Sequence, residues 1–514
     1  MKTAETETEA GNDPMQLGEL LAGVARANGA GRNGAAERQI SAVAYDSRQV
    51  TPGALFVAIR GEHADGNRFV GDAVERGAVA VVSEQARPAA GQQPRVGPEV
   101  AWVQVQEPRQ ALARIAANFY GRPAEALELV GITGTNGKTT TSFLVDSILR
   151  AAGHKTGLFG TIVYRTPKGE TTATHTTPES LELQKFFAQV RAESGTHVTM
   201  EVSSHALALD RVWGCRFAAA IFTNLTRDHL DFHKTMEAYG TAKRRLFEGT
   251  GAGAPRVGAV NRDDAWWERL TGLAERTLTY GLGPGAEVTT KRFALAFSGL
   301  EFTVQTPGGK LEIQSPLVGK INVYNILGAV AAAVGMGVPR DAIERGIREC
   351  RTVPGRFERV DCGQPFLVIV DYAHTDDALR NLLETAKELN PAGRIITLFG
   401  CGGERDRTKR PLMGEAAGAL SNLVVLTSDN PRGEDPLKII NDALVGLQRT
   451  GTEYLVEAER ARAVQMAIER ARAGDIVLLA GKGHETYQVL RERTIDYDDR
   501  EEARRVLRGL GHRR

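Results

Sequence analysis

The sequence predicts an α/β protein of three domains: a small N-terminal α/β domain, a central P-loop-type parallel sheet and a C-terminal Rossmann-like domain. Three observations lead to this prediction. The 514 residues exceed what one hydrophobic core supports. A buried strand, a glycine loop and a helix follow one another over residues 129–152. Four apolar strands alternate with amphipathic helices in the last part of the chain.

Composition and charge are those of an ordinary globular protein. Apolar residues make up 42% of the chain and charged residues 25%, and the net charge of +1 gives no argument for a nucleic-acid or membrane partner. The four cysteines are scattered without metal-ligand spacing, which fits a reducing compartment. The start of the chain lacks the apolar core of a signal peptide, and the near-apolar run 326–338 is too short to span a bilayer. We expect a cytoplasmic monomer.

The first expected domain follows a disordered acidic tail. We expect the tail over residues 1–16, the first domain over 17–124, the central domain over 125–352 and the last over 353–514. In the first domain, short strand-like runs around Tyr45 alternate with polar turns. Taken alone, the polar residues of these turns favour ordinary loop chemistry over a binding site.

A phosphate-binding loop is the most specific local signal. The motif GTNGKTT at 134–140 follows the apolar strand 129–132 and opens a helix. Glycine N–H groups, the helix N-terminus and the Lys138 ammonium can surround phosphate oxygens, while the Thr139 hydroxyl can reach a magnesium ion. The common pattern has a glycine where this chain has Ile132, so a glycine turn without a ligand is the alternative.

Other polar residues of the central domain follow its predicted strands. Glu201 ends the strand 196–202, and a carboxylate there is well placed to hold magnesium. His229 lies beside Asp228 in a later loop, where helix capping is the alternative. Lys243 lies on the helix that follows, and an isolated lysine there is expected to be a solvated surface residue. Asn322 and Asn325 open a buried alanine-rich helix, which they can cap, or they can contact a base.

The last domain is expected to be a doubly wound, largely parallel sheet. Each predicted strand runs into a polar loop, and ligands bind at the carboxyl ends of strands in such sheets. The predicted strands are 366–370, 394–399, 423–427 and 476–480, and the loops after them begin DYAHTDD, GCGGERDRTKR, SDNPRGEDP and GKGHETYQ.

Several motifs resemble those of the Mur ligases and occur in the same order. The resemblance covers nearly the whole chain beyond the tail, through GTNGKTT, EVSSHAL, TRDHLDFH, GRFE, DYAHTDDAL, CGGERDRTKRPLM, DNPR and GKGHE. It implies an enzyme of peptidoglycan precursor synthesis that joins a carboxylate to an amine through an acyl phosphate. It also implies ATP and Mg²⁺ as cofactors, and small-molecule substrates.

The resemblance assigns residues to ATP and magnesium. Asn325, Arg356 and Asp371 match positions that contact adenine, phosphate and ribose, and Lys243 matches a lysine that carries a carbamate. A carbamate makes chemical sense because an ammonium would repel magnesium, whereas a carbamate oxygen can ligate it. The implied catalytic residues are Lys138, Glu201, His229 and Lys243. The implied ATP-binding residues are Gly134, Thr135, Asn136, Gly137, Lys138, Thr139, Thr140, Asn325, Arg356 and Asp371. The implied metal ligands are Thr139, Glu201, His229 and Lys243.

The resemblance also implies a site for a UDP-N-acetylmuramoyl-dipeptide, which changes the reading of the first domain. Family members often have asparagine in place of His175 and glutamine in place of Leu209, so the contacts of these two residues are left open. Asp376 replaces a more usual proline. The matching residues are Tyr45, Ser47, Glu62, His63 and Ala64 on the uridine side, and His175, Thr176, Thr177, Ser203, Leu209 and Arg211 on the dipeptide side.

The incoming amino acid is expected to be meso-diaminopimelate. This amino acid differs from lysine by one carboxylate, which Arg432 can bind through two hydrogen bonds while Glu485 or Asp429 takes an ammonium. Lysine-adding relatives lack this arginine. The alternatives are a lysine-adding sister ligase, a folylpolyglutamate-type synthase and a non-catalytic nucleotide-gated binding protein. The implied pocket comprises Arg405, Asp429, Asn430, Pro431, Arg432, Gly481 and Glu485.

Overall fold

The computed structural model describes residues 13–25, 35–61, 64–89, 91–93 and 95–512. The chain folds into two compact units. The first comprises Met1–Gly131, Lys155–Ala218 and Arg245–Pro255, and the second comprises Ile132–His154, Ala219–Arg244 and Arg256–Arg514. The α/β class is confirmed. The three domain boundaries stay a prediction, and residues 1–12 of the expected tail lie outside the described residues.

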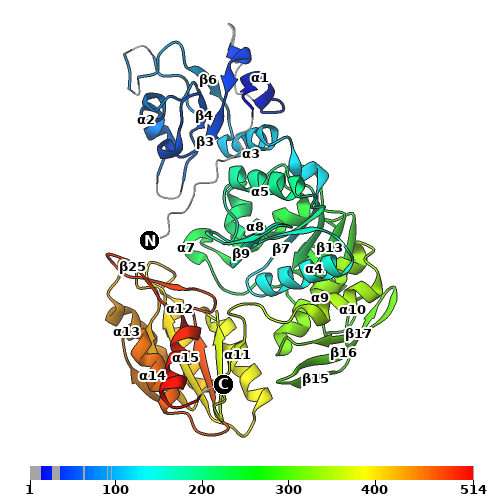
Figure 1. Cartoon of the computed structure of the whole chain (residues 1–514), viewed down its shortest axis with the longest axis vertical. Helices are drawn as coiled ribbons and strands as arrows, with labels where there is room; N and C mark the ends of the chain where they lie inside the picture. The colour runs from blue at the N-terminus through cyan, green and yellow to red at the C-terminus, as the bar shows by residue number, and fades with distance from the viewer. Residues whose placement is uncertain (1–12, 26–34, 62–63, 90, 94, 513–514) are drawn as a thin grey trace. The chain divides into compact units, whose positions relative to one another are not determined.

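A parallel four-stranded sheet in the order β3-β4-β5-β6 forms the N-terminal part of the first unit (Figure 1). Its region contains β1 (Met15–Gln16), α1 (Leu17–Leu20), β2 (Gln39–Ile40), β3 (Ala42–Ala44), β4 (Ala54–Val57), α2 (Val70–Glu75), β5 (Ala80–Ser83), β6 (Ala101–Gln104) and α3 (Pro108–Phe119). Residues of β4 alternate between the two faces. Leu55 packs in one hydrophobic cluster with Leu112 of α3, and Phe56 packs in another with Val70 of α2. Both faces of the sheet are therefore covered.

The rest of the first unit supplies the loop in which EVSSHAL lies. Its elements are β8 (Thr156–Phe159), β9 (Val163–Arg165), β10 (Glu170–Thr172), α5 (Ser180–Ala192), β11 (His197–Glu201) and α6 (Ser204–Ala208). Strand β11 pairs in parallel with β8 and ends at Glu201, as the sequence predicts. Helix α6 begins after Ser203, whose hydroxyl accepts a hydrogen bond from the backbone N–H of Ala206 at 3.1 Å.

The predicted strand, glycine loop and helix lead from the first unit into the second, which begins at Ile132. Strand β7 (Glu128–Thr133) leads through the glycine loop into α4 (Lys138–Ala151), whose Leu144 and Ile148 are fully buried. Gly346 of α10 lies against α4, where an added Cβ would come within 2.4 Å of the Ile148 Cα. The other elements are β12 (Phe217–Phe222), α7 (Leu230–His233), α8 (Met236–Glu248), β13 (Val257–Asn261), β14 (Arg276–Tyr280), β15 (Phe293–Ala296), β16 (Gly299–Thr306), β17 (Gly309–Ser315), α9 (Lys320–Gly335) and α10 (Arg340–Glu349). The antiparallel sheet β15-β16-β17 has no counterpart in the sequence predictions.

A six-stranded sheet in the order β18-β19-β23-β20-β21-β22 closes the chain. The four predicted strands are confirmed and are mutually parallel, and β22 and antiparallel β18 extend the sheet at its two edges. The elements are β18 (Glu358–Val360), β19 (Leu367–Asp371), α11 (Asp376–Leu389), β20 (Ile395–Cys401), α12 (Lys409–Leu420), β21 (Leu423–Ser428), α13 (Pro436–Leu447), β22 (Glu453–Val456), α14 (Arg460–Glu469), β23 (Ile476–Ala480), β24 (Tyr487–Val489), β25 (Thr494–Asp496) and α15 (Asp499–Gly509).

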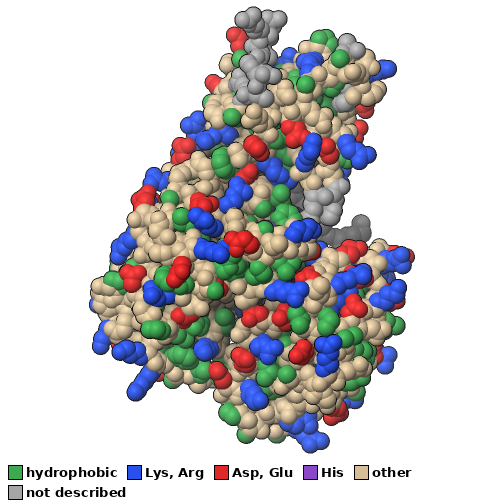
Figure 2. Space-filling view, turned by 180° about the vertical axis from the view of Figure 1, so that it is seen from behind, with side chains coloured by type: hydrophobic (Ala, Val, Ile, Leu, Met, Phe, Trp, Pro, Cys, Tyr) green, Lys and Arg blue, Asp and Glu red, His purple; other side chains and the backbone are tan. Residues whose placement is uncertain are grey.

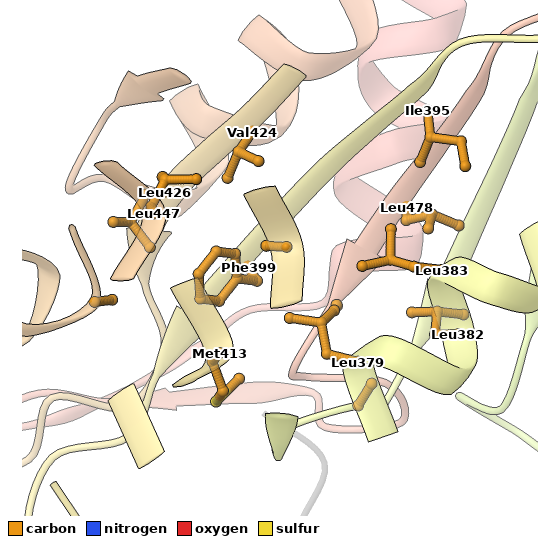
Figure 3. Close-up of a cluster of buried hydrophobic side chains, with 14 of the residues drawn as sticks. Leu379, Leu382, Leu383, Ile395, Phe399, Met413, Val424, Leu426, Leu447 and Leu478 are labelled. Carbon is orange, nitrogen blue, oxygen red and sulfur yellow. The ribbon is translucent and has the colours of Figure 1, made fainter. Parts of the chain in front are cut away.

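The two faces of this sheet carry separate hydrophobic clusters. Phe399 of β20 packs with Leu379 of α11 and Met413 of α12 on one face, which Figure 3 shows. Its neighbour Leu398 points to the other face and packs with Val464 of α14. Helices thus cover both faces, which confirms the doubly wound arrangement.

The surface carries charges of both signs. Figure 2 shows lysine and arginine side chains interspersed with aspartate and glutamate on the face drawn, as the net charge of +1 leads one to expect. Over the described part of the chain, no helix is both long and apolar enough to span a membrane. All four cysteines are buried thiols.

Candidate active site

The glycine loop is anchored by the segment that follows β12. The N–H of Thr135 donates to the carbonyl of Asn224 at 2.8 Å, and the N–H of Asn136 donates to the Asn224 side-chain oxygen at 2.9 Å. The hydroxyl of Thr223 donates to the carbonyl of Asn136 at 2.6 Å. At Gly134 (φ 148°), an added Cβ would lie 1.8 Å from that hydroxyl oxygen. The loop therefore requires glycine here, and Asn224 is an anchor that no sequence motif identified.

Two lysines share one carbonyl of this loop. The Lys138 ammonium donates to the carbonyls of Gly134 at 3.1 Å and Thr135 at 2.9 Å. The Lys243 amine donates to the same Gly134 carbonyl at 2.6 Å. Lys243 is 1% exposed, so the expectation of a surface lysine is wrong. Helix α8 turns this residue inward, onto the loop.

The surroundings of Lys243 favour its neutral form. Burial is the main cause that lowers the Lys243 pKa well below its ordinary value, and the charge of Lys138 adds to the effect. The charge of Asp228 opposes it. The amine lies over the ring of Tyr239, 4.4 Å from the ring centroid. A neutral, buried amine is a nucleophile.

Asp228 lies at the centre of a cluster of basic groups. Its carboxylate is 3.5 Å from Nε2 of His229, 4.0 Å from Nε2 of His374 and 4.0 Å from Nζ of Lys409. Although burial opposes ionisation, these three groups lower the pKa of Asp228. His374 and Lys409 come from the last sheet region, and neither was predicted as a site residue. His229 itself has a positive φ of 54°.

Arg356 connects the last region to the start of α4. Its guanidinium donates to the Thr139 hydroxyl at 3.2 Å and lies 4.5 Å from the ring centroid of Tyr372. Asp371 accepts the N–H groups of Phe357 at 2.7 Å and Ala373 at 2.8 Å. Desolvation raises the Asp371 pKa above its ordinary value, although the charge of Arg356 and these two hydrogen bonds oppose the shift. Asp371 therefore shapes the loop that presents Arg356.

Two asparagines complete the surroundings of the glycine loop. Asn136 donates to the carboxylate of Asp377 on α11 at 2.8 Å. Asn325 of α9 is buried and donates to Asn322 at 2.9 Å. At Gly137, an added Cβ would lie 2.4 Å from the Asn325 side-chain oxygen, so a larger residue at this position would clash with Asn325.

The DNPR and GKGHE loops meet after β21 and β23. Asn430 of the first loop donates to Glu485 of the second at 2.9 Å. Lys482 is fully buried and donates to both of these side chains at 3.0 Å. At Gly481 (φ 112°), an added Cβ would lie 2.7 Å from the carboxylate of Asp429. The structure thus brings together the two halves of the expected amino-acid pocket.

Arg432 and Arg405 supply positive charge to the same region. Arg432 donates to the carbonyl of Gly403 at 2.8 Å and has a positive φ of 51°. Burial lowers the Arg432 pKa, and the charge of Arg405 lowers it further. Pro431 lies between Asn430 and Arg432 in the DNPR loop. Two guanidinium groups beside two carboxylates suit a ligand that carries charges of both signs.

A buried arginine fixes the strand ends that carry these loops. Arg460 donates to the carbonyls of Ser428 at 3.3 Å and Ala480 at 2.9 Å, the residues just before the DNPR and GKGHE loops. Its guanidinium pairs with Asp499 of α15 at 2.7 Å, and both side chains are fully buried. Removal of either partner of a buried ion pair lowers stability strongly, because the other charge is left buried without compensation.

In the first unit, Glu179 organises the expected dipeptide residues. It accepts from Arg211 at 2.9 Å and from Arg109 at 3.0 Å. Arg211 also donates to the Thr177 carbonyl at 2.8 Å, and the Thr177 hydroxyl donates to the Glu201 carbonyl at 2.9 Å. Arg109 and Glu179 were not predicted, although both are charged and largely buried.

The Glu201 side chain has its own network. One oxygen accepts the Thr161 N–H at 2.8 Å, and the other accepts the Thr161 hydroxyl at 3.0 Å. That hydroxyl lies 3.1 Å from the hydroxyl of Thr176. His175 is held through its backbone, which exchanges hydrogen bonds with the Tyr164 hydroxyl.

The structure describes four of the remaining predicted substrate residues, Tyr45, Ser47, Ala64 and Leu209. The Tyr45 hydroxyl donates to Glu182 at 3.0 Å, and burial, followed by the charge of Glu182, raises the Tyr45 pKa. Ser47 is buried at the start of a single helical turn, and Leu209 caps α6. The Ala64 carbonyl accepts the Gly61 N–H at 2.7 Å. Glu62 and His63 lie outside the described residues.

The donor chemistry of the predicted metal set suits magnesium. The Thr139 hydroxyl and the Glu201 carboxylate are hard oxygen donors, and a carbamate on Lys243 would add another. Among the described residues, no three His, Cys, Asp or Glu side chains form a preformed metal group. Glu201 belongs to the first unit and the other three to the second, so the assembled set stays a prediction.

Three family models match successive parts of the chain. They are the Mur ligase family catalytic domain over residues 39–120, the Mur ligase middle domain over 132–333 and the Mur ligase glutamate ligase domain over 355–483.

Similar curated proteins extend over nearly the same length. A protein of Solibacter usitatus is 55% identical over 97% of this chain and 99% of its own, and one of Geobacter sulfurreducens is 47% identical over 91% and 94%. Both are named UDP-N-acetylmuramoyl-L-alanyl-D-glutamate–2,6-diaminopimelate ligase.

Solved structures are similar as well. A structure of a ligase of the same name has a TM-score of 0.66 at 31% identity, covering 97% of this chain and 100% of its own. Folylpolyglutamate synthase of Mycobacterium tuberculosis, complexed with ADP and AMPPCP, has a TM-score of 0.61 at 18% identity, covering 73% and 93%. The second likeness concerns the fold alone.

Proposed function

The chain belongs to the Mur ligase family, and we propose that it adds meso-diaminopimelate to UDP-N-acetylmuramoyl-L-alanyl-D-glutamate at the expense of ATP. One structural observation carries the choice of amino acid. Arg432 and Arg405 lie in the same loop cluster as Asp429 and Glu485, so the pocket offers partners for a carboxylate and for an ammonium. The names of the similar proteins support the same choice.

The reaction has two steps. In the first, the side-chain carboxylate of the D-glutamate attacks the γ-phosphorus of ATP, and ADP leaves. In the second, the amine of diaminopimelate attacks the acyl phosphate carbon, phosphate leaves with the bonding electrons, and the nitrogen loses a proton as the amide forms. Both steps move charge on oxygen atoms, so positioned cations are the main requirement.

The residues of the second unit supply these cations. Lys138 and the N–H groups at the start of α4 would hold the β- and γ-phosphates. Arg356, oriented by Asp371, would contact a phosphate, and Asn325 would face the adenine. The wider ATP set is Gly134, Thr135, Asn136, Gly137, Lys138, Thr139, Thr140, Asn325, Arg356 and Asp371.

Magnesium would be held by Thr139, Glu201, His229 and a carbamate on Lys243. When bound, Mg²⁺ neutralises charge on the phosphates. A carbamate forms when the neutral amine attacks carbon dioxide and loses one proton. The low pKa of Lys243 supports this modification, because only the unprotonated amine reacts.

The nucleotide-sugar dipeptide would be held by the first unit. Hydrogen bonds that link Arg211 to Glu179 and Thr177, Ser203 to Thr177, and Thr176 to Thr161 support this proposal, as does the bond from Tyr45 to Glu182. Ser47, Ala64, His175, Leu209 and the undescribed Glu62 and His63 complete the proposed set. We propose that the enzyme is a monomer and that it acts in the cytoplasm on these nucleotide-linked substrates. Its proposed domains extend over 17–124, 125–352 and 353–514.

Phosphate release across an amino-acid panel tests the function. Purified enzyme is given ATP, Mg²⁺ and UDP-N-acetylmuramoyl-L-alanyl-D-glutamate, together with meso-diaminopimelate, L-lysine or D-alanyl-D-alanine. We expect release with diaminopimelate to exceed that with lysine by at least about 100-fold, the factor set by a lost two-bond charged contact. Lys138→Ala is the inactive control. A preference for lysine would instead support the sister ligase, and absence of ADP would contradict both.

The carbamate is tested separately. Lys243→Arg replaces the amine with a guanidinium that cannot form a carbamate, and we expect it to lower kcat by about 100-fold or more. Carbon-13 NMR after equilibration with labelled bicarbonate should show one carbamate signal in the wild-type protein that is absent from the variant. An intact mass without the added group, combined with unchanged activity of the variant, would contradict the modification.

A further inference from the structure

Lys482 of the GKGHE loop has all of its hydrogen-bond donors occupied by the protein. Its side chain is 0% exposed. Its Nζ lies 3.0 Å from the Asn430 side-chain oxygen, 3.0 Å from the Glu485 carboxylate and 2.8 Å from the Tyr487 carbonyl. An ammonium group has three N–H donors, and these three acceptors use all of them. Lys482 therefore has no donor left for a ligand.

The acceptors of Lys482 come from the two loops that form the amino-acid pocket. Asn430 lies in the DNPR loop, and it also accepts the Val489 N–H at 2.9 Å through the oxygen that faces Lys482. Its amide nitrogen donates to Oε2 of Glu485, the same oxygen that Lys482 contacts. Two bonds on one oxygen fix the Glu485 carboxylate and leave Oε1 as the oxygen that can meet an ammonium.

Lys482 also sets the charge of the pocket. Its ammonium lies 3.9 Å from the Asp429 carboxylate, in addition to its contact with Glu485. Without this charge, the carboxylates of Asp429 and Glu485 would lose a cation that lies 3.9 Å from the first and 3.0 Å from the second. The pocket would then be more negative by one unit, which disfavours a carboxylate in the ligand and favours a lone ammonium.

From these contacts we propose that Lys482 is a positioning residue that sets the preference for diaminopimelate over lysine by holding Asn430 and Glu485 and by balancing the pocket charge. It acts without touching the amino acid. The inference rests on the proposed function. The distal end of diaminopimelate carries a carboxylate and an ammonium, whereas lysine carries the ammonium alone. The loss of one positive charge therefore affects the two amino acids in opposite directions.

Steady-state kinetics on charge-removing and charge-conserving variants test this role. For Lys482→Met, we expect the KM for diaminopimelate to rise by at least about tenfold, because a charged hydrogen-bond network is lost. The KM values for ATP and for the nucleotide-sugar dipeptide should stay within about twofold of the wild type, since the loops that bind them are separate. The ratio of kcat/KM for diaminopimelate to that for lysine should fall by at least about tenfold.

Two further variants separate charge from geometry. Lys482→Arg keeps the charge with a different shape, so its diaminopimelate-to-lysine ratio should stay near the wild-type value even if the KM rises. Lys482→Gln removes the charge while keeping a donor, so its ratio should fall as in Lys482→Met. Lys438→Met removes one exposed lysine from α13 of the same region and should change neither ratio nor KM. Thermal unfolding of each variant identifies the folded ones.

The outcomes separate this inference from the proposed function. A wild-type enzyme that does not use diaminopimelate overturns both. A wild type that uses it, with folded Lys482→Met or Lys482→Gln retaining the full preference, overturns the role of Lys482 alone. An equal rise in KM for all three substrates would also overturn it, because that is the signature of a general structural defect.

Discussion

Buried lysines in this protein are distinguished by the atoms that face them. Lys243 is 1% exposed and faces a carbonyl, an aromatic ring and the ammonium of Lys138, so its neutral form is favoured. Lys482 is 0% exposed and faces three oxygen atoms, one of them from a carboxylate. The first environment suits a reactive amine, whereas the second holds the side-chain nitrogen in three hydrogen bonds. Residue type and burial together therefore do not define a role.

Arg432 gives the clearest single-residue prediction. Arg432→Ala should raise the KM for diaminopimelate by more than about tenfold, because the extra carboxylate loses a two-bond charged partner. The KM for ATP should change little. Steady-state kinetics with each substrate varied in turn would check this, with the exposed Arg449→Ala as the matched control. An unaltered KM for diaminopimelate would argue against the pocket assignment.

Motifs identified most of the site residues, but not their supports. Lys138 and Arg432 could be found from sequence because each follows a predicted strand, and Arg356 because it lies in the GRFE motif shared with the Mur ligases. Asn224 and Arg460 could not be found from sequence, because neither lies in one of the motifs shared with the Mur ligases. Asn224 contacts the glycine loop and Arg460 contacts two strand ends, and in both cases the partners are distant in the chain. The burial of Lys243 was missed because the period of α8 alone does not say which side faces the glycine loop.

Loops between helices and strands of the last region are held by a second ion pair. Arg410 of α12 is 1% exposed and donates to both oxygens of Glu434, at 3.1 and 2.9 Å, in the loop before α13. The hydrogen bonds from Arg410 lower the pKa of Glu434 from 4.5 to about 2, although burial opposes them. Glu434 also accepts the Glu404 N–H at 2.5 Å, so it connects the loops that follow β20 and β21.

This pair predicts a pH-dependent contribution to stability. Because the folded pKa of Glu434 is lower than the unfolded one, the contribution is complete above pH 4.5 and disappears as the pH falls towards 2. Glu434→Gln should therefore lower the free energy of unfolding by about 1 kcal/mol at pH 7, allowing for solvent screening. The difference from wild type should shrink between pH 4.5 and 2. Urea unfolding over this range measures it, with exposed Glu415→Gln as control, and a constant difference would refute the assignment.

The close approach of α4 and α10 gives a prediction about packing. Gly346→Ala would place a methyl group 2.4 Å from the Ile148 Cα, in the backbone of the helix that begins with Lys138. Because backbone atoms cannot rotate away, we expect a loss of about 1–3 kcal/mol in the free energy of unfolding. Gly509→Ala, where an added Cβ meets nothing within 4 Å, is the control. Chemical denaturation of both variants would reveal the difference, and equal stabilities would show that the helices can move apart.

Across the second unit, the glycine loop and the last sheet are directly linked. Asn136 contacts Asp377, Arg356 contacts Thr139, and His374 and Lys409 lie within 4.0 Å of Asp228. A nucleotide that orders the glycine loop should therefore also order the start of α11. This coupling follows from contiguous contacts in one unit.

Hydrogen exchange can measure this coupling. A non-hydrolysable ATP analogue with Mg²⁺ should slow amide exchange in the first turns of α11 by about tenfold or more, as the link through Asp377 predicts. Asp377→Ala should reduce that protection while leaving protection of α4 by the analogue. Protection of α4 without any change at α11 in the wild-type protein would show that the two parts respond independently.

Over the whole chain, strand–loop alternation made the α/β fold and the doubly wound last sheet predictable. The strands β19, β20, β21 and β23 are apolar runs bounded by polar loops, which is a strong local signal. Strand β22 was missed because its residues are largely exposed. The sheet β15-β16-β17 was also missed, although Leu300, Phe302 and Val304 of β16 alternate with polar residues, which is a strand signal. Residues brought together by topology, such as Asp228 with Lys409, require the fold before they can be seen.

The pairing of Arg460 with Asp499 has a consequence for the order in which the protein matures. Strands β21 and β23 precede α15 in the chain, yet the guanidinium that bonds to their ends has its carboxylate partner on that helix. On the ribosome, the last sheet therefore stays electrostatically incomplete until residue 499 has left the exit tunnel. Ligand selection is thus among the latest properties that the newborn polypeptide acquires.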